Sequence, residues 1–266
     1  MPELPELEVA RKTLSPCVAG KIVAGVLVER VRSIRTPRED AHAFANGIAG
    51  RRVEGIERRG KALVFRLSGG VAAVFHYKLG ALAACRQEPV RKTGGVAWNF
   101  SDDSALEFTH MQLSEFHLAQ EQELSKLPVL KSGADPLSRS LTAKKLAGLL
   151  PAKKQLKAAL MDQNALGGIG NNYSDEILWN ARLSPFRKVG DLTGAEFEEL
   201  ARQIKSTLRE SIRAGGEEEF RDACGRHGRY QEKVRRRAGR PCRRDGHKIE
   251  MVKNGRKTFW CPHCQV

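Results

Sequence analysis

The sequence contains no run of about 18 apolar residues, the length that a membrane-spanning helix needs. It does not start with the charged and then apolar segments of a secretory signal peptide. Its six cysteines do not form the evenly paired framework of small secreted proteins. We therefore expect no membrane association and a cytoplasmic location.

Acidic residues are in the minority. The chain of 266 residues has 31 Asp and Glu against 46 Lys and Arg, which gives a net charge of +15. Such an excess predicts a polyanionic partner, most simply nucleic acid, although ribosomal-type or membrane-surface proteins share it. Nine Lys or Arg fall within the nineteen residues from Arg226 to Arg244. Because this run leads into a Cys/His cluster, we interpret it as part of a folded module.

The first six residues, Met1 to Glu6, suggest an unusual reaction centre, although an N-terminal extension is the ordinary interpretation. Removal of Met1 would leave Pro2 with a free secondary amine, which can attack a sugar carbon and form an iminium ion. The reference pKa of an α-amino group, about 7.7 to 8.0, leaves a useful fraction unprotonated near neutrality. Glu3 could then act as a general acid or base beside it.

The pattern of apolar residues predicts one β-rich half and one helical half. Helical spacing from residue 7 ends at Pro16, and Lys61 precedes one of the expected strands, where a plain surface lysine is the default interpretation. Residues 117–136 are polar and favour an interdomain connection. The expected strands are 22–28, 62–67, 70–75 and 96–100, with a hairpin turn at 68–70, and the expected helices are 142–150, 154–163, 173–181 and about 193–214.

A glycine-rich turn, Leu166 to Asn172, joins two of these helices. It is therefore not the strand–glycine–helix fingerprint of dinucleotide-binding proteins. The amides of Gly168 and Gly170, together with the start of the next helix, could bind a DNA phosphate, and Asn171 could add a side-chain donor. A tight corner between two helices is the alternative.

The C-terminal cysteines have the spacing of a structural zinc site. Cys261 and Cys264 form a specific knuckle, and Cys242 lies at a zinc-like interval before them. We favour His247 as the fourth ligand of one structural Zn²⁺, with Asp245 as the alternative. So small a module would depend on the metal for much of its stability. Arg256 lies at the tip of the hairpin that precedes the knuckle.

Five short motifs follow one another along the chain: Pro2-Glu3-Leu4-Pro5-Glu6, Arg59-Gly60-Lys61, Leu160-Met161-Asp162, Gly168-Ile169-Gly170-Asn171, and Arg256 ahead of Cys261-Pro262-His263-Cys264. In this order they resemble the formamidopyrimidine-DNA glycosylase/endonuclease VIII family of base-excision repair enzymes. The likeness spans essentially the whole chain. It implies an α+β fold in which an N-terminal β-sandwich faces a helix–two-turn–helix domain with a C-terminal zinc-finger β-hairpin, with damaged DNA between them.

The resemblance also implies domain boundaries and residue roles. The expected parts are the catalytic sandwich at 1–120, a linker at 121–136, the helix–two-turn–helix domain at 137–232 and the zinc-finger hairpin at 233–266. Pro2 would attack C1′ of a flipped nucleotide, Glu3 would transfer protons, and elimination of phosphate on both sides could follow. Lys61, Asn171 and Arg256 would bind the phosphates that flank the lesion, and Lys61 would also belong to the catalytic group. Glu6 would shape the base pocket, and Glu176 would support the terminal amine.

The sequence departs from the family pattern at the residues that insert into the DNA stack after the damaged base has flipped out. Leu79 stands at the usual Met position, and residues 109–114 lack the usual Arg–Phe pair, although Leu113 could still act as a wedge. The loop at about 222–230 is short, and the zinc ligands are not four cysteines. We therefore expect an active monomeric glycosylase/lyase that is not restricted to 8-oxoguanine and that acts on oxidised pyrimidines, hydantoins, abasic sites, single-stranded DNA or bulky lesions.

Two other functions remain compatible with the sequence. One is a non-catalytic DNA-binding paralogue with the same fold, which retention of Met1 would favour because a blocked Pro2 cannot attack. The other is an RNA-binding protein with a zinc knuckle, which would not need Pro2 or Glu3.

Overall fold

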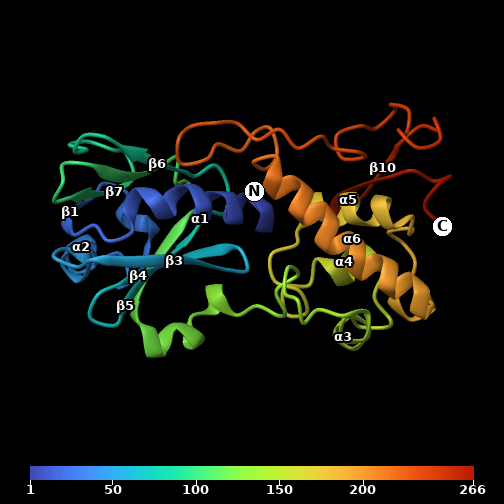
Figure 1. Ribbon diagram of the computed structural model, residues 1–266, viewed down its shortest axis with the longest axis horizontal. Helices are drawn as coiled ribbons and strands as arrows, with labels where there is room; N and C mark the ends of the chain where they lie inside the picture. The colour runs from blue at the N-terminus through green and yellow to red at the C-terminus, as the bar shows by residue number, and fades with distance from the viewer. The chain divides into compact units, whose positions relative to one another are not determined.

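The computed structural model describes residues 1–266, with the side chain of Asn254 excepted (Figure 1). The chain divides into two compact units that interleave in sequence. The first comprises residues 1–2, 6–131 and 218–228, and the second comprises residues 3–5, 132–217 and 229–266. The segment 218–228 thus belongs to the first unit although second-unit residues flank it on both sides.

The first unit contains two β-sheets. One has four strands in the order β1-β7-β8-β6, and the other has five in the order β2-β9-β5-β4-β3. The strands are β1 (Val23–Val28), β2 (Ile34–Thr36), β3 (Val53–Arg59), β4 (Ala62–Leu67), β5 (Val71–His76), β6 (Leu82–Arg86), β7 (Val96–Phe100), β8 (Ala105–Thr109) and β9 (Glu115–Gln120), and the unit also holds the helices α1 (Leu4–Val18, of which 6–18 lie here) and α2 (Ala41–Ile48).

Buried aromatic rings join the two sheets. Phe65 of β4 packs edge-on against Trp98 of β7 with ring centroids 5.1 Å apart, and Phe75 of β5 lies 4.7 Å from Phe108 of β8. All four side chains are buried. The contacts cross between the sheets and form the core of a sandwich, because alternate residues of each strand point inward.

The four predicted strands are present in the structure as β1, β4, β5 and β7, and a hairpin turn at 68–70 connects β4 to β5. Gly69 and Gly70 both have positive φ, which explains why glycines occupy this turn. The remaining strands lacked a clear sequence signal. In β3 only Val53 and Ile56 are aliphatic, and their spacing is not that of a strand, while β9 carries Glu115 and His117.

Helix α1 continues to Val18, so the expectation that it ends at Pro16 is wrong. A proline lacks one N–H donor and crowds the carbonyl of the residue four positions earlier. Here the helix ends two residues later, and few backbone bonds are affected.

The polar segment after β9 is packed against the sandwich. It forms two 3₁₀ turns, η2 (Glu121–Lys126) and η3 (Pro128–Leu130). Leu124 is buried there with Val64 and Val74 from the outer face of β4 and β5. The first unit therefore extends to Lys131, and the second continues from Ser132.

The second unit is helical and carries the C-terminal hairpin. Its longest helix begins after Thr193, whose side chain forms a capping box with Glu196 and so satisfies the first free amides. The helices α5 and α6 contact each other and share one buried apolar cluster, and Figure 1 shows α6 in orange. The elements are α3 (Ala143–Leu149), α4 (Leu156–Leu160), α5 (Asn171–Ala181), α6 (Gly194–Arg213), β10 (Glu250–Asn254) and β11 (Arg256–Trp260).

All four predicted helices of this half are present. Among the described residues, no helix is both long and apolar enough to cross a bilayer.

Candidate active site and metal centre

The carboxylate of Glu3 caps the start of α5. One oxygen accepts the N–H of Gly170 at 2.7 Å and that of Tyr173 at 3.3 Å, and the other accepts the N–H of Asn172 at 2.9 Å. Glu3 is only 2% exposed. Gly170 itself cannot provide a side-chain cap, so the carboxylate satisfies amides that would otherwise lack partners. The three bonds fix Glu3 and, through the peptide bond, limit where Pro2 can lie.

The glycine amides of the preceding turn are donors within the protein. Gly170 N–H is bound to Glu3, and Gly168 N–H donates to Oε1 of Gln163 at 2.9 Å. Gly168 has φ +102°, and its carbonyl accepts the N–H of Leu4. This arrangement differs from our expectation, because both amides already donate to acceptors within the protein and are not available to a phosphate.

Asn171, the first residue of α5, is half-buried. Within the part of the chain that the structure describes, its buried Oδ1 atom has no hydrogen-bond partner. An amide oxygen left without a partner is costly, and such positions in native proteins call for an explanation. A ligand at this helix start would supply one.

One turn further along, Asp175 of α5 forms a buried ion pair with Lys157 of α4 at 2.7 Å. The Lys157 ammonium also donates to the carbonyl of Lys257, and the other Asp175 oxygen accepts the N–H of Phe259 at 3.1 Å. Burial raises the pKa of Asp175 to about 7 and lowers that of Lys157. The pair connects both helices to strand β11.

A cleft of about 620 Å³ opens between α4 and the hairpin in this unit. Lys154, Lys157 and Arg256 supply positive charge to its wall, and Phe186 and Val252 supply apolar surface. Arg256 is exposed at the first position of β11, directly after Gly255 at the hairpin tip. A concave surface with several cations suits a phosphodiester backbone.

Glu176 binds a backbone loop. Its carboxylate accepts the N–H groups of Lys233, Val234 and Arg235 at 2.8 to 3.0 Å and the hydroxyl of Tyr230 at 3.2 Å. Both oxygens therefore hold residues 230–235. These contacts are sufficient to explain why Glu176 is buried, and no contact to the terminal amine is needed for that explanation.

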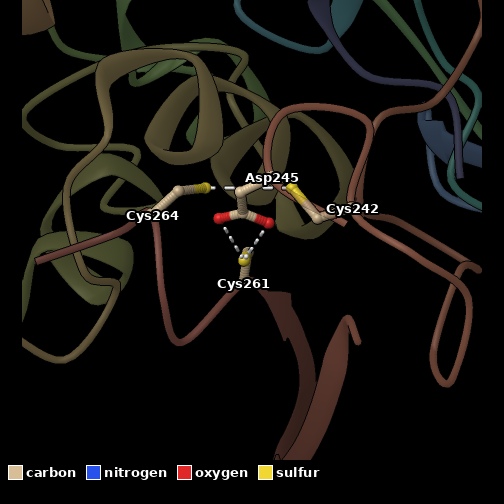
Figure 2. A group of neighbouring side chains, drawn as sticks. All are labelled: Cys242, Asp245, Cys261 and Cys264. Carbon is tan, nitrogen blue, oxygen red and sulfur yellow. Dashed lines mark hydrogen bonds between the residues drawn. The ribbon is translucent and has the colours of Figure 1, made fainter. Parts of the chain in front are cut away.

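Three cysteines and one aspartate meet near the C-terminus (Figure 2). The ligand atoms of Cys242, Asp245, Cys261 and Cys264 all lie within 4.8 Å of one another. The Cys242 and Cys264 sulfurs are 3.9 Å apart, and an Asp245 oxygen lies 3.4 Å from the Cys261 sulfur. Three sulfurs and a carboxylate are donors that Zn²⁺ takes in four-coordinate sites, so the residues fit one structural zinc ion.

The geometry favours Asp245 as the fourth ligand in place of His247, which the sequence suggested. Gly246 turns the chain with φ +77°, so that the neighbouring side chains diverge. The Asp245 side chain is 16% exposed, whereas that of His247 is 53% exposed and stacks on His263 at 3.8 Å. The His247 N–H donates to Asp245 at 3.0 Å and so orients the carboxylate.

The sulfurs receive hydrogen bonds from α5 and from the loop. Trp179 Nε1 donates to the Cys242 sulfur at 3.3 Å, and the Arg244 guanidinium donates to the Cys264 sulfur at 3.4 Å. Arg244 also lies over the Trp179 ring at 4.0 Å. Donors of this kind stabilise thiolates around a metal. Helix α5 therefore extends from the Glu3 carboxylate at its start to the metal cluster near its end.

The first unit carries the other predicted site residues. Lys61 lies in the two-residue turn between β3 and β4, immediately before the strand, as its position in the sequence suggested. Glu6 is fully buried in the first turn of α1, whereas Pro2 and Lys61 are half-buried.

Two exposed leucines project from neighbouring turns of this unit. Leu79 is 49% exposed and Leu113 is 54% exposed. The two turns are tied together because the Ser114 hydroxyl donates to the Tyr77 carbonyl at 2.5 Å. Large apolar side chains are costly to expose in water, and these connected turns leave both leucines available for contact with a partner.

Four residues of the site were missed by the sequence analysis: Lys157, Asp175, Trp179 and Arg244. Lys157 and Asp175 are polar positions on helices, where solvent exposure is the usual outcome, and neither belongs to a motif. Trp179 lies three residues after Glu176 on the same helix, and only its spacing from Asp175 hinted that it faces the hairpin.

Three family models match successive parts of the chain. Residues 1–114 match the formamidopyrimidine-DNA glycosylase N-terminal domain, residues 132–221 match the H2TH domain of the same enzyme, and residues 239–266 match the zinc finger found in FPG and IleRS. The chain belongs to the formamidopyrimidine-DNA glycosylase family. Its fold class, family and single structural zinc site therefore agree with the expectations from sequence.

Relatives of the glycosylase family match the chain over its full length. The formamidopyrimidine-DNA glycosylase of Geobacillus kaustophilus is 36% identical over an alignment of 275 positions, gaps included, and the alignment covers 100% of both chains. The crystal structure of MutM (Fpg) from Thermus thermophilus has a TM-score of 0.85 at 33% identity and covers 99% of this chain and 98% of that one. A mutant of Lactococcus lactis FPG in complex with Fapy-dG containing DNA has a TM-score of 0.89 at 25% identity, with 99% of each chain covered.

Proposed function

We propose that this chain is a bifunctional DNA glycosylase and AP lyase of base-excision repair. The observation that carries the proposal is the buried Glu3 carboxylate, which three backbone amides fix immediately after Pro2. The same bonds cap α5, and they also fix a carboxylate beside the nucleophile. A proton-transfer group needs such a constraint, because its catalytic contribution depends on position.

The chemistry begins with Pro2 after removal of Met1. The lone pair of the Pro2 nitrogen attacks C1′ of a flipped nucleotide, and the glycosidic bond breaks as the base leaves with the bonding electrons and a proton. Opening of the sugar gives an iminium link between Pro2 and C1′. Glu3 is the group closest along the chain to exchange protons with the sugar during these steps.

The iminium link acidifies the adjacent sugar carbon C2′. Loss of a C2′ proton expels the 3′ phosphate, a second elimination expels the 5′ phosphate, and water then releases Pro2. Lys61, Asn171 and Arg256 would hold the phosphates that flank the lesion and fix the backbone without reading sequence. The cationic cleft beside Arg256 supports the part of this assignment that concerns Arg256. For zinc, we propose Cys242, Asp245, Cys261 and Cys264 as ligands.

We propose further that the substrate range is not restricted to 8-oxoguanine. Gln112 and Ser114 stand in the segment where the resemblance leads one to expect an arginine and a phenylalanine, so only Leu79 and Leu113 remain to fill the space of a flipped base. Apolar wedges stabilise the distorted duplex without reading the opposite base. One structural neighbour, Lactococcus lactis FPG, was solved with DNA that contains an oxidised pyrimidine.

The decisive experiment is borohydride trapping on DNA with an abasic site. The wild type should form a covalent adduct whose N-terminal peptide carries the DNA, and Pro2→Gly should form none. Glu54→Gln, at an exposed position of β3, should trap DNA like the wild type. Tight DNA binding without an adduct, in protein shown by mass spectrometry to lack Met1, would instead support a non-catalytic DNA-binding protein.

The substrate range needs a separate comparison. A panel of duplex and single-stranded oligonucleotides with hydantoin, oxidised pyrimidine and 8-oxoguanine lesions should show cleavage of several lesions with little dependence on the opposite base. Cleavage of duplex 8-oxoguanine opposite cytosine alone would contradict the proposed range and leave the proposed chemistry intact.

A further inference from the structure

The three cysteines outside the metal cluster meet in the first unit. Cys17 lies in the last turn of α1, Cys85 lies in β6, and Cys224 lies in the segment 218–228. All three thiols are free. Cysteines this far apart in sequence come together only through the fold, and none of them belongs to the proposed reaction.

Hydrogen bonds tie the three backbones together. Cys85 N–H donates to the carbonyl of Ala223 at 3.0 Å, and Ala223 N–H donates to the hydroxyl of Thr13 at 3.3 Å. The thiol of Cys17 in turn donates to the carbonyl of Thr13 at 3.3 Å. The segment that carries Cys224 is therefore docked between α1 and β6.

The side chains interact as well. Cys17 and Cys224 both lie close enough to the Cys85 thiol to raise its pKa. Burial raises the pKa of the Cys85 thiol, and its Cys17 neighbour raises it further, so Cys85 is protonated at neutral pH. Cys224 is exposed and is the thiol that a dissolved oxidant reaches first.

The geometry suits a disulfide better than a metal site. Among the described residues, groups of three or more ligands within 4.8 Å occur only around Asp245, so these three thiols do not form a ready-made metal site. A disulfide needs only two sulfurs. Because Cys85 N–H bonds to the carbonyl that precedes Cys224, the Cα atoms of Cys85 and Cys224 lie within about 7 Å of each other. A disulfide usually joins Cα atoms about 4.4 to 6.8 Å apart.

We propose that Cys17, Cys85 and Cys224 form a peroxide-sensitive modification site, in which oxidation of Cys224 leads to a disulfide between Cys224 and Cys85. Hydrogen peroxide transfers one oxygen to the Cys224 sulfur, which gives a sulfenic acid and one water. The Cys85 sulfur then attacks the Cys224 sulfur, the S–O bond breaks, and the Cys85 proton leaves with the hydroxide as a second water. Two thiols thus lose two electrons and two protons.

The crosslink would fasten the segment 218–228 to strand β6. One main-chain hydrogen bond to β6 and one bond to the Thr13 hydroxyl of α1 connect that segment, and such bonds open in local fluctuations. A covalent bond removes that freedom. Cys17, which lies near Cys85, provides a second partner to which the disulfide can pass by thiol exchange.

Peptide mapping tests the proposal on the zinc-loaded full chain without any DNA substrate. Trypsin places the three cysteines in separate peptides, 13–21, 79–86 and 222–226. After treatment with hydrogen peroxide and alkylation of free thiols, non-reducing mass spectrometry should find 79–86 joined to 222–226, and dithiothreitol should separate them.

Two serine variants complete the test. Cys224→Ser should slow the loss of the Cys85 thiol at least about tenfold, because the exposed entry point is gone. Cys17→Ser should still form the crosslink. A bond between 13–21 and 79–86 that forms equally fast in Cys224→Ser, or oxidation confined to the zinc ligands, would overturn the proposal. The outcome is independent of glycosylase activity, so failure of either proposal leaves the other standing.

Discussion

The Lys157 ammonium lies 2.7 Å from the Asp175 carboxylate, and both side chains are buried where strand β11 meets helices α4 and α5. Removing one partner of a buried pair leaves an uncompensated charge and costs about 3 to 5 kcal/mol. Lys157→Met should therefore lower the free energy of unfolding by about 3 kcal/mol in urea titrations and weaken DNA binding at the adjacent cleft.

Lys154→Met is the matched control for this substitution. Lys154 pairs with Asp162 at 2.7 Å, but its side chain is 47% exposed. Exposed ion pairs contribute about 0 to 1 kcal/mol, so the unfolding free energy should hardly change. Equal losses in both variants would show that the buried pair has no special role in docking the hairpin.

Glu3→Gln should destabilise the second unit as well as reduce base excision. Both oxygens of Glu3 accept backbone N–H groups, and a glutamine would turn one of them into an NH₂ group that faces a donor. An unsatisfied buried donor costs about 1 to 3 kcal/mol. Differential scanning calorimetry should show a lower Tm for Glu3→Gln and no change for Glu54→Gln. An unchanged Tm in both would mean that the cap does not contribute to stability.

Zinc content distinguishes the two candidates for the fourth ligand. Asp245→Asn should lower zinc affinity by about 100-fold or more and leave less than one ion per chain after dialysis, because an oxygen ligand loses its charge. His247→Asn should keep one ion, because the imidazole is exposed and stacked on His263. Atomic absorption and a chelator titration give both quantities. The opposite ranking would restore His247 as the ligand.

Stability of the first unit should fall below pH 6.5 because of His76. Burial lowers the pKa of His76 to about 4, and its Nδ1 accepts the N–H of Lys78 at 3.2 Å. The unfolded chain, with a His pKa of about 6.5, binds the proton more tightly. The contribution is therefore complete above pH 6.5 and is lost as pH falls towards 4, by about 2 kcal/mol between pH 7 and pH 5.

Urea titrations at both pH values measure this loss. Nearby charges act in both directions, since Glu115 raises the pKa of His76 whereas Lys78, Lys61 and His117 lower it. His76→Gln should remove most of the pH dependence over this range. His42→Gln, at an exposed position of α2, should leave it unchanged. Identical pH profiles for all three proteins would assign the effect to other groups.

The two exposed leucines should matter for duplex substrates only. Leu79→Ala combined with Leu113→Ala should lower the rate of excision from duplex DNA roughly tenfold, because the wedge loses about 1 to 2 kcal/mol of apolar contact. Excision from single-stranded DNA, which has no stack to open, should stay within twofold. Ile22→Ala, which also truncates an exposed apolar residue of the first unit, serves as the control. Equal loss on both substrates would assign the leucines a structural role.

The sequence allowed prediction of what depends on local patterns. Apolar runs and glycine turns located the strands around residues 62–75, and helical spacing located α3 to α6. Cysteine spacing located the metal site as far as three of its ligands. The fourth could not be predicted, because the choice between Asp245 and His247 depends on which way the chain turns at Gly246.

Contacts between residues far apart in the chain could not be predicted from the sequence either, because they also depend on how the chain folds. The capping of α5 by Glu3 joins residues 167 positions apart, and nothing near Gly170 indicates it. Of the two amides that we assigned to a phosphate, that of Gly170 binds a carboxylate of the protein itself, and that of Gly168 binds the side chain of Gln163. Likewise, Cys17, Cys85 and Cys224 have no recognisable spacing in the sequence, and only the fold brings them together.

Helix α5 also constrains how this family member can change length. From Asn172 to Trp179 the axis rises about 10 Å, and that distance separates the contact to Glu3 from the contact to Cys242. One inserted or deleted residue would rotate one end by about 100° relative to the other and break one set of contacts. The length of α5 between these two contacts is therefore fixed. We expect natural variation in chain length to fall in loops on either side of the helix.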